Sequence, residues 1–258
     1  MLVIAMPDYT ARELMVIAAA REIRDGDVVF VGMRLPLLAF ALAKRTHAPT
    51  ALGLFENGIV RETPSSEMLY TMSDPPNLPG ATWSTGTPNI MGMLAQGLVD
   101  LGFIGGAEVD RYGNLNTSYI GDWRAPKVKL PGSGGAPDIA CFAKRFVIVM
   151  PQEKHRFVEK VNFVTSTGHG DGGDWRKRTG LPGGGPVALI TTLGVFRFDA
   201  SSGEAYLASW HPGQSADALR AETGWPLRVA ADARETPTPT AGELAIVRDC
   251  DPQGFWTR

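Results

Sequence analysis

A glutamate that follows an apolar run is the residue of this sequence best placed to do chemistry. Residues 50–55 form a short strand-like segment, and Glu56 stands directly after it, ahead of the turn-forming pair Asn57 and Gly58. Side chains at the end of a strand emerge at the rim of an α/β sheet, where ligands bind. A carboxylate held there can attack an acyl carbon. The four residues 55–58 alone fit a solvated surface turn equally well.

A carboxylate nucleophile needs hydrogen-bond donors aimed at the oxyanion that develops during attack, and main-chain N–H groups commonly supply them. Two glycine-containing segments of the sequence could do so. One follows an apolar run and the other precedes a helical stretch, where N–H groups can converge on an anion. A plain turn explains the second segment about as well. The candidates are Gly32, Met33 and Arg34 in the first segment, and Gly132, Ser133, Gly134, Gly135 and Ala136 in the second.

The other polar candidates favour a structural interpretation. Glu108 and Asp110 could form an acid/base pair or a metal site, but residues 110–114 fit a hydrogen-bonded turn between two extended stretches better. Cys141 and Cys250 are far apart and lack metal-ligand spacing. We therefore expect two reduced thiols and no metal site.

The histidines and tryptophans add little to this set. His155 lies in a charged stretch typical of a solvated face, whereas His169 lies in a glycine-rich loop and could approach a ligand. Trp123, Trp175 and Trp210 could wall a pocket, although burial in the core is the stronger interpretation.

The elements that must position Glu56 alternate between helix and strand. The pattern predicts a helix at 10–24, a strand at 28–31, a helix at 37–45 and a strand at 51–55. Thr10 and Glu13 form a potential capping box, and Pro36 suits the first turn of the second helix. This alternation is typical of βαβ units and indicates a parallel sheet.

The rest of the chain extends the same pattern. We expect long loops that include one short helix over 61–88, helices at 90–98, 138–145, 215–223 and 241–248, and strands at 101–104, 146–150, 161–164, 187–191, 195–198 and 204–209. The last two strands would form a hairpin. The sequence thus predicts an α/β fold with an open, mainly parallel sheet flanked by helices, and residues 1–258 as one domain.

Composition narrows the function classes. The 258 residues are 44% hydrophobic and 20% charged, with a net charge of −2, so neither a nucleic-acid-binding face nor a polybasic membrane site is indicated. No run approaches the 18 or so apolar residues of a membrane span. Residues 1–6 are apolar but too short for a signal peptide. We expect a cytoplasmic protein.

Several segments, taken together and in order, resemble the family I coenzyme A transferases, and specifically their glutaconate-type B subunits. The Glu-Asn-Gly sequence at Glu56 matches the signature that carries the catalytic glutamate of the family. Phe55 and Arg61 depart from the wider signature, which has Ser and Gly or Ala at these places. The other matching segments are 31–36, 105–116, 132–136, 153–157 and 180–183.

The resemblance implies a ping-pong transfer of coenzyme A. Glu56 would attack an acyl-CoA to give an acyl-glutamyl anhydride, and CoA thiolate would convert this to a glutamyl-CoA thioester that an acceptor acid consumes. Main-chain N–H groups near Met33 and Gly135 would stabilise the oxyanions. Coenzyme A would be a substrate, with no metal or other cofactor. An A subunit would complete the enzyme, and the AB pairs would assemble further. The resemblance leaves the acids themselves open.

Two other functions fit the same residues. A hydrolase or decarboxylase of CoA thioesters would use Glu56 as a general base, although the resemblance implies that relatives with these activities have replaced the glutamate. A non-catalytic protein that binds CoA or a sugar phosphate is the third hypothesis. Retention of Glu56 favours transfer.

Overall fold

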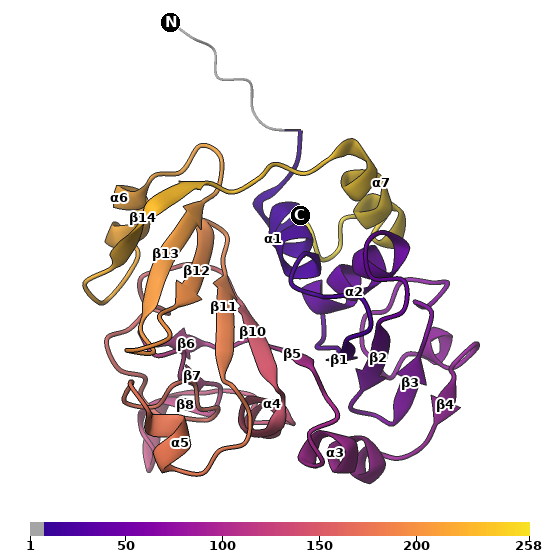
Figure 1. Ribbon diagram of the computed structural model, residues 1–258, viewed down its shortest axis with the longest axis horizontal. Coiled ribbons are helices and arrows are strands. Elements are labelled where there is room, and N and C mark those ends of the chain that lie inside the picture. The colour runs from indigo at the N-terminus through magenta and orange to yellow at the C-terminus, as the bar shows by residue number, and fades with distance from the viewer. Residues whose placement is uncertain (1–7) are drawn as a thin grey trace, which may run out of the picture.

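The computed structural model describes residues 8–258 and contains a ten-stranded sheet, shown in Figure 1. The strands lie in the order β14-β13-β12-β11-β10-β5-β1-β2-β3-β4, and the central five, from β11 to β2, run parallel. The predicted open, mainly parallel sheet is confirmed. Its strands are β1 (Val28–Phe30), β2 (Leu52–Phe55), β3 (Ile59–Arg61), β4 (Trp83–Ser84), β5 (Leu101–Ile104), β10 (Arg145–Val149), β11 (Pro186–Ile190), β12 (Gly194–Phe198), β13 (Ala205–Trp210) and β14 (Arg228–Glu235).

Helices cover both faces of the sheet, because successive strand residues point to opposite sides. Val147 of β10 belongs to the core beneath α1, α2 and α7, whereas Phe146 and Ile148 belong to the core beneath α3, α4 and α6. Figure 1 shows α1, α2 and α7 grouped together. The helices are α1 (Ala11–Ala20), α2 (Leu35–Arg45), α3 (Thr87–Ala95), α4 (Ala136–Phe142), α5 (Trp175–Arg178), α6 (Ala216–Ala221) and α7 (Ala241–Cys250), with a 3₁₀ turn, η1 (Pro75–Asn77).

Local sequence signals explain where the first helices begin. The predicted capping box of α1 is present, since Thr10 Oγ1 accepts from Glu13 N and the Glu13 carboxylate accepts from Thr10 N. Pro36 lies in the first turn of α2, as predicted. The hairpin of β12 and β13 across residues 199–203 is also confirmed.

Three expectations differ from the structure. Residues 161–164 do not form a strand, because Asn162 hydrogen-bonds to Glu108 in an irregular segment. The 61–88 region contains the one short helix we allowed for, η1, but also the edge strand β4. The strand β14 and the ribbon of β8 (Tyr119–Asp122) with β9 (Ala125–Lys129) were missed, because their sequences lack an apolar period. The ribbon of β6 (Glu108–Val109) with β7 (Leu115–Asn116) supplies the two extended stretches that we expected on either side of the 110–114 turn.

Two sequence-based expectations concern the membrane and the amino terminus. Within residues 8–258, no helix has the length and apolarity needed to cross a membrane. The apolar stretch 1–6, which we do not expect to be a signal peptide, lies outside the described residues.

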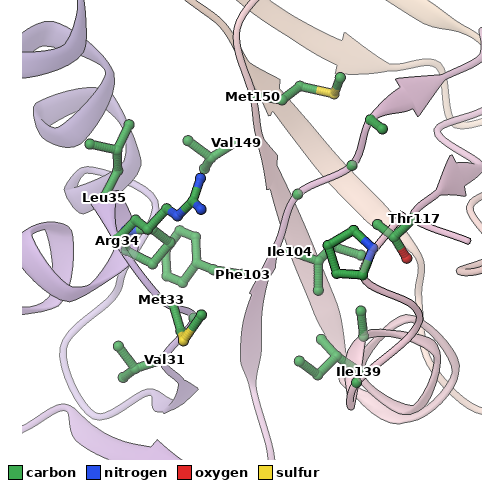
Figure 2. A pocket seen from close by; sticks show the side chains of 18 of the residues that line it. Val31, Met33, Arg34, Leu35, Phe103, Ile104, Thr117, Ile139, Val149 and Met150 are labelled. Carbon is green, nitrogen blue, oxygen red and sulfur yellow. The ribbon is translucent and has the colours of Figure 1, made fainter. Parts of the chain in front are cut away.

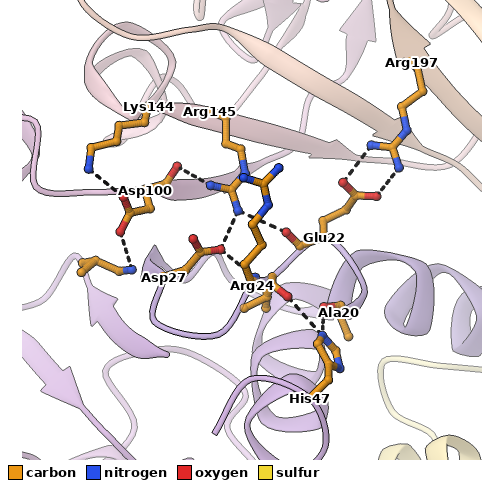
Figure 3. A network of polar contacts seen from close by, with 11 residues as sticks. Ala20, Glu22, Arg24, Asp27, His47, Asp100, Lys144, Arg145 and Arg197 are labelled. Carbon is orange, nitrogen blue, oxygen red and sulfur yellow. Dashed lines mark hydrogen bonds and ion pairs between the residues drawn. The ribbon is translucent and has the colours of Figure 1, made fainter. Parts of the chain in front are cut away.

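A charged network joins the amino ends of β1, β5 and β10 and reaches Arg197 of the antiparallel strand β12 (Figure 3). Asp27, just before β1, pairs with Arg145 at the start of β10, and both side chains are largely buried. Asp100, just before β5, pairs with Lys144 at 2.7 Å. Glu22 pairs with Arg197 of β12. The network therefore joins the segment after α1 to three strands.

Breaking the buried pair in this network is expected to destabilise the fold. Asp27→Asn leaves the guanidinium of Arg145 without its carboxylate, and should lower the free energy of unfolding by about 3–5 kcal/mol. Urea unfolding measures the change. Asp249→Asn is the matched control, because the Arg45–Asp249 pair is exposed and should contribute no more than about 1 kcal/mol. Equal effects of the two substitutions would contradict this account.

A buried histidine gives the fold a defined pH dependence. His211 Nε2 donates to the Thr191 carbonyl and Nδ1 accepts from Thr236 Oγ1, so the ring is held neutral. Burial lowers the pKa of His211 from 6.5 to about 4. Between about pH 4 and pH 6.5, the imidazole of His211 therefore binds a proton in the unfolded chain but not in the folded one. Stability is therefore full above about pH 6.5 and falls by about 3 kcal/mol as the pH drops to about 4.

Urea unfolding of wild type and His211→Gln at several pH values between 4 and 7 tests this dependence. Glutamine can keep both hydrogen bonds but cannot titrate, so the variant should lack the His211 share of the slope. Identical pH slopes for the two proteins would show that His211 is not the source.

Candidate active site

A cavity of about 860 Å³ lies at the carboxyl edge of the parallel strands. Each of the five parallel strands contributes residues that follow it, as expected where an α/β sheet changes its winding direction. The loop before α4 and the C-terminal segment form the rest of the wall. The strand-end residues are Val31 to Arg34 after β1, Glu56 after β2, Gly105 to Ala107 after β5, Met150 and Pro151 after β10, and Thr192 after β11.

Glu56 reaches the cavity because a tight turn joins β2 to β3. Gly58 N donates to Phe55 O at 2.9 Å to close the turn. Gly58 has a φ of +107°, and a Cβ there would lie 2.1 Å from the Thr85 carbonyl oxygen, so no other residue fits. Asn57 Nδ2 donates to Met72 O at 2.9 Å. Asn57 and Gly58 do not themselves line the described cavity wall; both hold Glu56 in place.

Gly135 lies next to the Glu56 carboxylate. A Cβ built on Gly135 would lie 3.2 Å from Glu56 Cδ and 3.3 Å from each carboxylate oxygen, so the main chain of residue 135 approaches Glu56 closely. Gly132, Ser133, Gly134 and Ala136 line the wall beside it. The structure thus places the whole predicted 132–136 segment on the wall of the cavity that Glu56 lines, with Gly135 closest to the carboxylate among its glycines. Because α4 has only seven residues, the close approach of the main chain, rather than a helix dipole, is the basis for assigning this segment to the site.

The segment after β1 forms the opposite wall. Figure 2 shows the side chains of Met33 and Arg34 in the cavity, and Gly32 lies beside them. Arg34 has φ 67° and ψ −122°. It is the only residue other than glycine with a positive φ among residues 8–258. Such a conformation costs about 1–3 kcal/mol and tends to occur at functional sites.

The charges in the cavity are unequal. Among the described residues of its wall, Glu56 is the one side chain with a carboxylate, and three side chains of the same wall carry a guanidinium group, those of Arg12, Arg34 and Arg156. The remaining wall is largely apolar, which suits an organic acyl group with a few fixed polar contacts.

Glu108 and Asp110 form the structural turn that the sequence favoured. Asp110 accepts hydrogen bonds from Tyr112 N and Asn114 N, and Glu108 accepts from Asn116 and Asn162. Burial raises the pKa of Asp110. Within residues 8–258, no cluster of three or more His, Cys, Asp or Glu residues could hold a metal ion.

The histidine and tryptophan candidates lie away from the cavity. His169 Nε2 donates to the Pro186 carbonyl, and His155 is exposed beside Glu153. Trp123 is 64% exposed, so it is neither a pocket wall nor part of the core. Trp175 and Trp210 do not line the described cavity either.

The two cysteines are free thiols, as expected. Cys141 lies in α4 and Cys250 ends α7, and burial raises the pKa of both thiols. Neither is part of the cavity wall.

The C-terminal part of the wall was not predicted from the sequence. Phe255 and Trp256 line the cavity, and Trp256 Nε1 donates to Leu69 O at 3.2 Å. No sequence signal could place these residues near Glu56, because the Trp256–Leu69 contact spans 187 positions.

Arg61, one of the departures from the family signature, is buried rather than directed at the cavity. Its guanidinium donates to four carbonyl oxygens and so anchors the 63–79 loop. The acceptors are the carbonyls of Thr63, Pro64, Asn77 and Pro79.

Known proteins share both the sequence and the fold. The sequence profile of the coenzyme A transferase family matches residues 12–222. The chain is 43% identical over 244 residues to the B subunit of 3-oxoadipate CoA-transferase from Pseudomonas knackmussii, covering 94% of both chains. It is 36% identical over 252 residues to the B subunit of glutaconate CoA-transferase from Acidaminococcus fermentans, covering 94% of this chain and 92% of that one.

Two solved structures have a fold similar to that of this chain. The crystal structure of glutaconate coenzyme A-transferase from A. fermentans has a TM-score of 0.91 at 33% identity, covering 97% of this chain and 98% of that one. The decarboxylase AibA/AibB has a TM-score of 0.83 at 31% identity, covering 96% and 97%. The chain belongs to the coenzyme A transferase family. It is a B-type subunit of that family, and the fold also occurs in an enzyme with a different reaction.

Proposed function

We propose that this chain is the B subunit of an acyl-CoA:carboxylate CoA-transferase in which Glu56 is the covalent nucleophile. The observation that carries the proposal is the position of Glu56. It is the carboxylate of the described cavity wall, it stands at the end of a central strand, and the main chain of Gly135 lies close to its oxygens. A carboxylate fixed among apolar and cationic groups suits attack on a bound acyl carbon.

The reaction proceeds through two kinds of acyl-enzyme. A Glu56 oxygen attacks the thioester carbon, the C–S bond breaks, and an acyl-glutamyl anhydride and CoA thiolate result. The thiolate attacks the Glu56 carbonyl carbon, and the first acid leaves as its carboxylate. The acceptor carboxylate attacks the resulting glutamyl-CoA thioester. The released thiolate then attacks the new acyl carbon and restores Glu56. Coenzyme A is thus a substrate, and no step requires a metal or redox cofactor.

Every step passes through a tetrahedral oxyanion that needs donors. We assign this role to the main-chain N–H groups of Met33 and Gly135, which lie on opposite walls of the cavity. Loss of one such donor typically costs about 10²–10³ in kcat. Gly32, Gly132, Ser133, Gly134 and Ala136 would shape the space for the pantetheine thiol and the acyl group.

An A subunit is the proposed partner. The relatives of this chain are B subunits, and two residues at the cavity, Met33 and Arg34, are exposed in this chain alone. Met33 is 47% exposed, so its part of the cavity wall presents apolar surface in this chain alone. A partner that covers this side would exclude water from the glutamyl anhydride.

A hydrolase or decarboxylase is the second candidate, because AibA/AibB has this fold. The test is to co-purify the chain with its A subunit and to incubate the pair with an acyl-CoA, with and without acceptor acids. Transfer predicts new acyl-CoA in the presence of acid and little release of free thiol. Thiol release without any acceptor would indicate a hydrolase, and binding without turnover would indicate the non-catalytic alternative.

A further inference from the structure

Three guanidinium groups line the cavity, but two of them are held by oxygen acceptors. Arg12 Nη1 donates to the main-chain oxygen of Arg258 at 2.8 Å, and Arg156 Nε pairs with Glu153 at 3.1 Å. Within residues 8–258 Arg34 forms no ion pair, and residues 1–7 contain no acidic side chain. Arg34 is therefore the arginine of the cavity wall whose guanidinium has no hydrogen-bond or ion-pair partner among the described residues.

The main chain at Arg34 suggests that its side chain has a use. A φ of 67° with ψ of −122° suits glycine far better than arginine. The Arg34 side chain makes no capping hydrogen bond to α2. Non-glycine residues in such an unfavourable conformation cluster at active sites and ligand-binding positions, and here the Arg34 side chain has no structural hydrogen bond to account for it.

Trp256 holds the guanidinium from one side. The Arg34 Cζ atom lies 5.8 Å from the centroid of the Trp256 ring, within the range of a cation–π contact. Trp256 is itself fixed by two hydrogen bonds, from its indole N–H to Leu69 O and from its main-chain N–H to the Asp251 carboxylate. Contact with the ring face leaves the N–H edge of the guanidinium free. A guanidinium binds a carboxylate in a bidentate manner through this edge.

Arg34 and Glu56 lie at the same edge of the sheet. Their strands β1 and β2 are parallel neighbours, with Phe30 opposite Leu54, and adjacent strands are about 4.8 Å apart. Figure 2 shows the Arg34 guanidinium pointing into the cavity, with the apolar side chains of Phe103 and Val149 nearby. The cavity therefore combines a reactive carboxylate, a cation and apolar walls.

We propose that Arg34 binds the second carboxylate of a dicarboxylic acyl group and thereby selects dicarboxylic over monocarboxylic acids. One carboxyl group of the substrate reacts at Glu56, the methylene chain lies on the apolar wall, and the distal carboxylate pairs with Arg34. This inference rests on the proposed CoA transfer. Arg34 is a specificity-determining residue here and takes no part in bond making.

The test compares acceptor acids of equal length in the enzyme purified with its A subunit: glutarate with pentanoate, and adipate with hexanoate. Arg34→Gln should lower kcat/KM for the dicarboxylic acids by about 10²-fold and for the monocarboxylic acids by less than about threefold. Arg34→Lys should restore part of the loss, because it keeps the charge but not the fork. Arg34→Gly suits the main-chain conformation, so it should show the same selective loss without loss of thermal stability.

Each other result overturns the assignment. An equal loss for both acid series, or a raised KM for the acyl-CoA with every acid, would mean that Arg34 binds a CoA phosphate or supports the loop. Unchanged selectivity would mean that it binds no carboxylate. These failures are distinct from failure of the proposed function, which would appear in the wild-type enzyme as no transfer to either series.

Discussion

Replacement of Glu56 by glutamine is expected to abolish CoA transfer, with a loss in kcat of about 10⁴–10⁶. An amide has no carboxylate oxygen to attack the thioester, so neither the anhydride nor the glutamyl-CoA intermediate can form. The fold should be unaffected, because glutamine has the same shape and Glu56 forms no ion pair within residues 8–258. Steady-state exchange of labelled CoA between two acids, in the enzyme purified with its A subunit, measures the loss.

Glu62→Gln is the matched control for this substitution. Glu62 is an exposed glutamate that directly follows the strand β3, on the hairpin that carries Glu56, and it does not line the cavity. Its replacement should leave kcat unchanged within about twofold. Circular dichroism and urea unfolding of both variants check that the fold persists. If Glu56→Gln retains more than about a tenth of the parental kcat, Glu56 is not the nucleophile.

Gly135→Ala is expected to lower kcat by about tenfold while leaving stability within about 1 kcal/mol. Gly135 has φ −81° and ψ 3°, which alanine adopts freely, so the main chain is not strained by the change. The new methyl group would lie 3.2 Å from Glu56 Cδ and 3.3 Å from both oxygens, so the carboxylate must shift by a few tenths of an ångström. Because a misplacement of about 1 Å in a reacting group can cost about 10²-fold in rate, this smaller shift should cost about tenfold.

Gly242→Ala controls for the added methyl group. A Cβ at Gly242 meets nothing within 4 Å, so that substitution should change neither activity nor folding. Parental activity in Gly135→Ala would refute the close approach of the 132–136 segment to Glu56. A large loss of stability instead would assign Gly135 a structural role.

The residues that could be predicted from the sequence are those whose positions depend on local patterns along the chain. Glu56, Met33 and Gly135 were found because each follows a strand or precedes a helix, and the chain itself marks such positions with apolar runs and glycine. The parallel order of β1 and β2 then brings the first two together. Their catalytic roles stay predictions that the two substitutions above will test.

Contacts between distant segments could not be read from the sequence. Trp256 reaches the cavity only because the Asp251 carboxylate, which accepts hydrogen bonds from the main chain that follows it, folds the C-terminal segment back toward Leu69. Arg61 gave the same difficulty. Its place close to the signature gave no indication of its direction, and the structure shows that its guanidinium is buried and bonded to loop carbonyls. A side chain's direction depends on what packs around it, which the local pattern does not contain.

Chemical trapping of the enzyme-bound CoA tests the central claim most directly. The wild-type complex is incubated with acyl-CoA in the absence of an acceptor acid, treated with hydroxylamine or borohydride, digested, and examined by mass spectrometry. A glutamyl-CoA thioester predicts that the peptide containing Glu56 carries the hydroxamate or the reduced alcohol, and that Glu56→Gln carries neither. An unmodified Glu56 peptide from an enzyme that still transfers CoA would contradict covalent catalysis at this residue.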